Sequence, residues 1–135
     1  MPKFTVLATT ADTITLKTPG NNYENTFALS PRAGKTFKPE IGQVISGSIY
    51  APAWKAEAVE MGGNYVEPLL GRPRRMQGTI LSQRIESNEL TVQVGYPVTV
   101  VLPREHYDVA RFAVGSRIGW DNIEMPQFAP DVAAH

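Results

Sequence analysis

The sequence contains no cysteine among its 135 residues. This absence excludes a disulfide framework, a thiolate metal site and a cysteine nucleophile. No stretch approaches the roughly 18 consecutive apolar residues of a membrane-spanning helix, and the first residues lack the apolar core of a secretion signal. We therefore expect no membrane association and a cytoplasmic or virion-associated protein.

Histidine is almost as scarce, and His106 and His135 are the only imidazole groups available for acid–base chemistry. The run Glu105-His106-Tyr107-Asp108 could suggest a metal site, but adjacent ligands rarely converge on one ion, so a solvated helical turn is the better interpretation. The sequence also lacks a Gly-x-Ser-x-Gly elbow, a P-loop and a dinucleotide fingerprint. We expect a non-enzymatic protein with no catalytic residue, no metal and no cofactor.

The chain has no net charge, with 13 basic and 13 acidic residues. The two signs are unevenly distributed. Residues 1–78 hold nine Lys/Arg against six Asp/Glu (9 − 6 = +3), and residues 79–135 hold four against seven (4 − 7 = −3). Strong nucleic-acid binders usually carry a clear basic excess, so this balance counts against such a role unless the positive charge gathers on one face.

Glycine and proline, in contrast, are abundant at 11 residues each, which indicates many turns. Between the turns, polar and apolar residues alternate with a period of two, as in residues 13–17, and β-branched residues are frequent. Residues 54–61 are compatible with a strand or a short helix. We favour a strand that forms a hairpin with residues 65–67 across Gly62-Gly63. The pattern predicts an all-β protein.

The second half of the sequence repeats the pattern of the first half at a nearly constant spacing. Four successive segments match in the same order, for example Val6 with Ile80 (80 − 6 = 74) and Ile45 with Ile118 (118 − 45 = 73). We interpret this as an internal duplication in which neither unit buries enough apolar surface alone. The matched segments are 5–7 with 78–81, 12–17 with 87–94, 26–31 with 97–103, and 37–45 with 112–118.

Each unit resembles the OB-fold, and within it the S1-like barrels, on the strength of two short motifs. These are Gly78-Thr79-Ile80 at the start and Phe112-Ala113-Val114-Gly115-Ser116-Arg117-Ile118 at the end. The aromatic Phe-Gly-x-Phe-Val stretch of S1 domains is missing at residues 90–101, which puts the implied RNA binding in doubt, and an SH3-like barrel would explain the pattern almost as well. The resemblance implies two related small β-barrels, at residues 1–50 and 77–124. A linking hairpin with an Arg-rich turn (51–76) would join them, and an extended C-terminal tail (125–135) would follow.

The Arg-rich turn contains Arg72, Arg74 and Arg75 between two prolines. Guanidinium groups bind phosphates, and the nearby aromatic residues Tyr50, Trp54 and Tyr65 could stack on bases, so these six residues form a candidate site for single-stranded nucleic acid. The alternative is that the arginines pair with Glu57, Glu60 and Glu67 and that Trp54 belongs to the core.

Two functions follow from these patterns. The first is a binding protein that holds single-stranded nucleic acid through the Arg-rich turn and its aromatic neighbours. The second is a structural or assembly protein, such as a coat, decoration or scaffold subunit, that contacts other protein chains. In both cases we expect a homo-oligomer, because each unit has a small core.

Overall fold

The computed structural model describes residues 3–18, 20, 23–33, 37–122 and 124–131. All regular structure in this part of the chain is β-strand, apart from two short 3-10 turns, so the predicted all-β class is confirmed. No helix in the described part is long and apolar enough to cross a membrane. The strands are β1 (Lys3–Thr9), β2 (Thr13–Lys17), β3 (Glu24–Leu29), β4 (Val44–Val59), β5 (Tyr65–Glu67), β6 (Leu70–Gly71), β7 (Arg75–Arg84), β8 (Glu89–Gln93), β9 (Pro97–Val101), β10 (Arg117–Asn122) and β11 (Gln127–Pro130), and the 3-10 turns are η1 (Pro31–Ala33) and η2 (Val109–Arg111).

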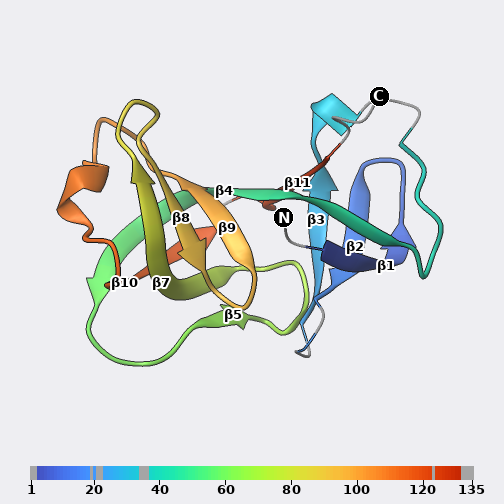
Figure 1. Cartoon of the computed structure of the whole chain (residues 1–135), viewed down its shortest axis with the longest axis horizontal. Helices are drawn as coiled ribbons and strands as arrows, with labels where there is room; N and C mark the ends of the chain where they lie inside the picture. Colours follow the sequence, from blue (N-terminus) through green and yellow to red (C-terminus); the bar gives the residue numbers. More distant parts are fainter. Residues whose placement is uncertain (1–2, 19, 21–22, 34–36, 123, 132–135) are drawn as a thin grey trace.

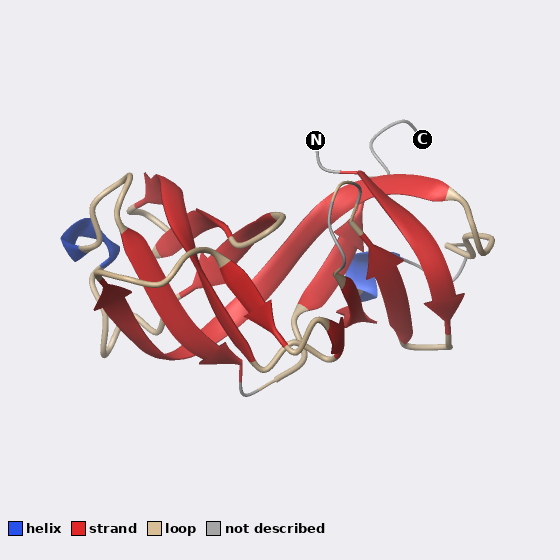
Figure 2. Cartoon of the chain, turned by 90° about the horizontal axis from the view of Figure 1, so that it is seen from below, coloured by secondary structure: helices blue, strands red, loops and turns tan. Residues whose placement is uncertain are grey.

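The strands form one large mixed sheet in which β4 takes part in two circuits of pairing. The first circuit runs from β1 through β2, β3, β11 and β4 back to β1. The second runs from β4 through β10, β7, β8 and β9 back to β4. Figure 1 shows the two groups of strands side by side, with the 16-residue β4 running from one to the other. Figure 2 shows the same long strand from below.

Alternation of side chains explains why these segments form half-buried strands. In β8, Leu90 and Val92 are buried, while Thr91 between them is half-buried on the other face. The facing strand β9 repeats this arrangement with Val98 and Val100. Because successive side chains of a strand point to opposite faces, this pattern directs one face of each strand into the core.

The cores of the two circuits are continuous because Tyr96, in the turn between β8 and β9, reaches into the first circuit. Its ring is 2% exposed and lies edge-on to Phe4 and Phe27, with ring centroids 6.0 and 5.9 Å away. Its hydroxyl donates a hydrogen bond to Asn25 Oδ1 (2.9 Å). The second half therefore supplies part of the packing of the first half.

The expected linking hairpin is wrong. Residues 54–59 do form a strand, as the part of β4 after its midpoint, but this part pairs with β10 rather than with residues 65–67. Strand β5 pairs instead with the beginning of β7, through Val66 and Met76 among others. Residues 53–59 of β4 instead pair with a strand from far along the chain, and such tertiary pairing overrides local turn signals.

The domain boundaries expected from the sequence fall inside paired elements. The expected end of the first unit, at residue 50, lies in the middle of β4, which is continuous from Val44 to Val59. The expected tail contains β11, which pairs with β3 on one side and with β4 on the other. Both segments are integral parts of the sheet.

Candidate functional site

The three arginines of the turn line one open depression on the surface, together with Asp121 and Asn122. The backbone holds the turn in place. The Arg74 amide donates to Glu67 O (2.8 Å), and the Asn122 amide donates to Arg74 O (2.7 Å). The turn is therefore fixed against both β5 and β10, although its residues lie far from β10 in the sequence.

Arg75 is engaged by two carboxylates. Its Nη1 lies 2.9 Å from Asp121 Oδ1 and its Nη2 lies 3.1 Å from Glu57 Oε1. Burial alone would lower the pKa of Arg75, but hydrogen bonds with Asp121 and Tyr65 outweigh it and raise the pKa above its usual value. Pairing of Arg75 with Glu57 agrees with one part of the alternative in which the arginines pair with Glu57, Glu60 and Glu67, and the sequence did not predict the pairing with Asp121 because this residue lies on β10.

Gly119 gives the Arg75 side chain room to cross the sheet. A Cβ atom at this position would lie 2.9 Å from Arg75 Nη2 and 3.3 Å from Gln77 Oε1. The absence of a side chain on β10 thus allows an arginine on β7 to reach a glutamate on β4. Glu57 and Asp121 compensate the positive charge of Arg75, and this residue therefore stabilises the fold.

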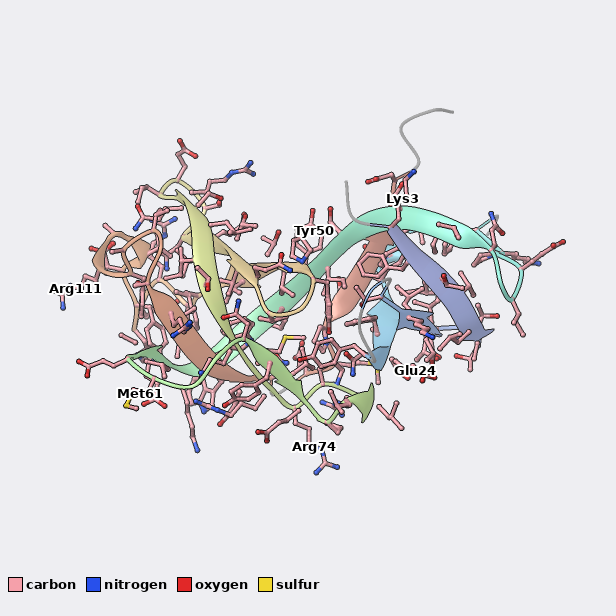
Figure 3. The ribbon with its side chains drawn as sticks, turned by 60° about the horizontal axis from the view of Figure 1, so that its bottom comes forward. Lys3, Glu24, Tyr50, Met61, Arg74 and Arg111 are labelled. Atoms are coloured by element: carbon pink, nitrogen blue, oxygen red, sulfur yellow. The ribbon has the colours of Figure 1, made fainter. Side chains whose placement is uncertain are left out.

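Arg72 and Arg74 are both exposed. Figure 3 shows the Arg74 side chain projecting away from the ribbon. Among the residues that the structure describes, Arg74 has no ion pair. The cationic part of the turn that is directed to solvent is therefore smaller than the sequence predicts.

The three predicted aromatic residues do not gather at one place. Tyr65 contacts Arg75, and Trp54 is the register partner of Asp121, so both flank the depression. Trp54 is 40% exposed with its ring edge-on to His106, which means that it is not a core residue. Tyr50 lies on the side of the molecule away from Arg74, as Figure 3 shows.

Apolar side chains that the sequence reasoning passed over lie along the same segment as the arginines. Met61 is 81% exposed, Leu70 is 61% exposed and Leu69 is 52% exposed. Figure 3 shows Met61 at the opposite end of the molecule from Glu24, the register partner of Leu70, so Met61 lies apart from the two leucines. We call Leu69, Leu70, Arg72 and Arg74 the linking-segment face.

Tyr50 lines two adjoining hollows elsewhere on the surface, and both also include Arg84 and Glu89. Sequence reasoning assigned Tyr50 to the nucleic-acid site because of its closeness to Trp54 in the sequence. Their separation follows from the strand itself, because β4 carries Tyr50 at the junction with β9 and β11 and carries Trp54 beyond it.

Among the described groups considered for enzymatic or metal chemistry, Glu105, His106 and Asp108 are exposed. His106 is exposed in the turn before η2, and His135 lies outside the described residues. In the described ranges, no three His, Asp or Glu side chains lie close enough to hold a metal ion.

Comparisons with protein-family models, with curated proteins and with solved structures find no match to this chain.

Proposed function

We propose that the chain is a non-enzymatic binding protein built from two OB-like barrels that arose by duplication and exchanged their fifth strands. One support is the position of the bulges. The β1–β2 ladder shifts register between Val6 and Ala8, and the β7–β8 ladder shifts between Ile80 and Ser82, at matching positions 74 residues apart (80 − 6 and 82 − 8). A bulge forms at a specific position in a strand, so bulges at matching positions favour a common origin of the two halves by duplication.

The parallel pairings support the exchange of strands. Gln127 pairs with Ala28 in the first circuit, and Pro52 pairs with Val101 in the second. These pairs correspond at offsets of 75 (127 − 52) and 73 (101 − 28). In each circuit the order is first, second, third, fifth and fourth strand, as in an OB-fold, and the fifth strand comes from the other half.

For the activity, we propose an assembly role in which two copies associate through the linking-segment face. The observation that carries this proposal is the exposure of Leu69 and Leu70 beside Arg72 and Arg74. Arginine is enriched at protein interfaces. The exposed Glu67 lies in the same segment, so a two-fold contact could pair an arginine with this glutamate of the other copy.

Sedimentation velocity tests this association over a range of protein concentrations. We expect a concentration-dependent dimer that the substitution Leu70→Glu abolishes, because it places a charge in the apolar centre of the face. Leu81→Glu is the matched control, since Leu81 is also exposed (49%) but lies on β7 outside the face. A monomer at all concentrations, or equal effects of the two substitutions, contradicts the proposal.

A second candidate is the binding of single-stranded nucleic acid at the same face. The observation that favours it is that Arg72 and Arg74 line one depression with Tyr65 and Trp54 beside it. With Arg75 compensated by Glu57 and Asp121, binding would depend on the exposed Arg72 and Arg74, so it would be weak and strongly reduced by salt.

Fluorescence anisotropy with a labelled oligonucleotide at low salt tests the second candidate. We expect the double substitution Arg72→Ala/Arg74→Ala to abolish binding. The control is Arg104→Ala/Arg111→Ala, which removes the same charge from exposed positions elsewhere. Absence of binding by the unmodified protein, or an equal loss in the control, removes this candidate.

A further inference from the structure

A polar groove lies where β4 passes from the first circuit to the second. Two adjoining hollows share Tyr50, Arg84 and Glu89 and together make this groove. Tyr50 stands at its centre, 37% exposed, because its register partners are Gln127 of the first circuit and Thr99 of the second. We call this the Tyr50 groove. Its other polar lining residues are Ser30, Ser48, Ser82, Gln83, Thr91, Thr99 and Gln127.

Several of these polar side chains have no hydrogen-bond partner among the residues that the structure describes. In the described part of the chain, the side chains of Tyr50, Ser48, Ser82, Thr91 and Thr99 make no hydrogen bond. Ser48, Thr91 and Thr99 are half-buried, whereas Tyr50 and Ser82 are exposed. Without partners among the described residues, their hydroxyl groups are available for a ligand that can both donate and accept hydrogen bonds.

Other threonine hydroxyls of the protein do have a hydrogen-bond partner. Thr15 and Thr26 are register partners in the β2–β3 ladder, and their hydroxyls bond to each other at 2.8 Å. Thr91 and Thr99 are register partners in the corresponding β8–β9 ladder, and within the described residues no such bond joins them. Only the second pair lines the groove.

The charge of the groove is balanced. Arg84 and Glu89 are register partners at the end of the β7–β8 ladder, and no ion pair joins them within the described residues. One positive and one negative group do not favour a polyanion such as nucleic acid. They supply one strong donor and one strong acceptor beside the hydroxyls.

We propose that the Tyr50 groove binds a short, uncharged oligosaccharide. The Tyr50 ring packs against the apolar face of one sugar ring, and its exposed area allows this contact without rearrangement. Sugar hydroxyls then bond with Thr91, Thr99 and Ser82, while Glu89 accepts and Arg84 donates. The two adjoining hollows hold neighbouring sugar units, with Ser30 and Gln127 bordering the second hollow.

This proposal is independent of the assembly role, because the groove shares no residue with the linking-segment face. The experiment is a titration of isotope-labelled protein with cellohexaose, maltohexaose and chitohexaose, followed by the shifts of backbone amide resonances. We expect at least one of the three sugars to bind in the millimolar range or tighter. Its shifts should concentrate in β8, β9 and the middle of β4.

Three variants locate the binding. Tyr50→Ala and the double variant Thr91→Val/Thr99→Val should each weaken binding about tenfold or more, because they remove the stacking surface and the unpartnered hydroxyls. The double variant Thr15→Val/Thr26→Val is the matched control, since it makes the same chemical change in the first circuit, outside the groove. It should bind as the unmodified protein does.

The outcomes that overturn the proposal are distinct. They are an absence of shifts with all three sugars, shifts that map away from the groove, or an equal loss in the Thr15→Val/Thr26→Val control. Shifts in the groove on addition of trialanine or inorganic phosphate, with none from the sugars, also overturn it, because they assign the groove to charged ligands.

Discussion

Tyr96 is the residue through which the two halves depend on each other most directly. Its ring lies edge-on to Tyr23 as well as to Phe4 and Phe27, at a centroid distance of 6.0 Å from Tyr23. Its hydroxyl bonds to Asn25, whose Nδ2 in turn donates to the carbonyls of Pro68, Leu69 and Gly71 at 3.0–3.3 Å. One buried amide and one buried phenol thus join β3, the β8–β9 turn and the segment around β6.

This arrangement predicts a loss of stability at high pH. Desolvation, together with the nearby Tyr23, raises the pKa of Tyr96 well above 10. Because the folded protein holds this proton more tightly than the unfolded chain, the contribution is fully present below about pH 10 and declines as the pH rises toward the folded-state pKa. We expect the free energy of unfolding to fall by about 1.4 kcal/mol per pH unit through this group, on top of the titration of other residues.

Urea denaturation between about pH 8 and 11 tests this prediction by comparison with Tyr96→Phe. At neutral pH the variant should be less stable by about 1–3 kcal/mol, because Asn25 Oδ1 loses its buried donor. The difference should shrink as the pH rises, since the variant has no proton to lose at this position. A difference that stays constant across this range contradicts the prediction.

Gly78 is the second residue on which a sharp prediction rests. A Cβ atom there would collide with the backbone carbonyl of Gln93, which belongs to the paired strand β8. We expect Gly78→Ala to destabilise the protein by about 3 kcal/mol or more, by forcing the β7–β8 ladder apart. Gly63→Ala is the matched control, because a Cβ at Gly63 meets nothing within 4 Å. Thermal or urea unfolding measures both, and similar stabilities of the two variants would show that the ladder can absorb the extra atom.

At the scale of elements, β11 shows how a short strand can be essential. Phe128 is fully buried and packs edge-on against Phe4, with ring centroids 5.9 Å apart, while its neighbour Gln127 is exposed. We expect Phe128→Ala to cost about 3–5 kcal/mol, the usual range for a buried phenylalanine. Gln127→Ala should change the stability by less than about 0.5 kcal/mol, as surface substitutions do. Urea unfolding of both variants tests whether β11 belongs to the core. If β11 were a dispensable arm, neither substitution would change the free energy of unfolding.

The strands themselves were largely predictable, because their alternation depends on local sequence. The bulk of β2, β8 and β9 lies where the period of two places it, at residues 13–17, 89–93 and 97–101. The partners of the strands were less predictable. Gly62-Gly63 favours a hairpin locally, but this part of β4 pairs with β10, nearly 60 residues away (117 − 59 = 58), and β5 pairs with β7.

The residues that come together at the candidate site were also only partly predictable, because tertiary pairing decides their neighbours. Pairing of Arg75 with Glu57 follows from the density of acids near the turn, whereas its partner Asp121 and the separation of Tyr50 from Trp54 are consequences of the tertiary fold. The Tyr50 groove combines residues of β4, β7, β8, β9 and β11, none of which is unusual for a strand. Its only signal in the sequence is the number of threonines and serines on the outer faces of these strands.

For the whole molecule, the sharing of β4 and the position of β11 make the two circuits mutually dependent. Each circuit needs a strand that is covalently continuous with the other half, and Tyr96 of the second half fills space in the first. Separated halves would each lack one strand of their circuit and leave two strand edges unpaired. We therefore expect the halves to fold and unfold as one unit, despite their two circuits.

Native-state hydrogen exchange tests this dependence more directly than a melting curve. The slowest amide protons of β2, in the first circuit, and of β8, in the second, should exchange with free energies that agree within about 0.5 kcal/mol, because both require global unfolding. Phe128→Ala removes packing from the first circuit, where Phe128 contacts Phe4. If the halves are coupled, this substitution lowers the exchange free energy of β8 by the same amount as that of β2. If the substitution lowers the exchange free energy of β2 but not that of β8, each circuit opens independently. The shared strand β4 would then transmit no stability from one half to the other.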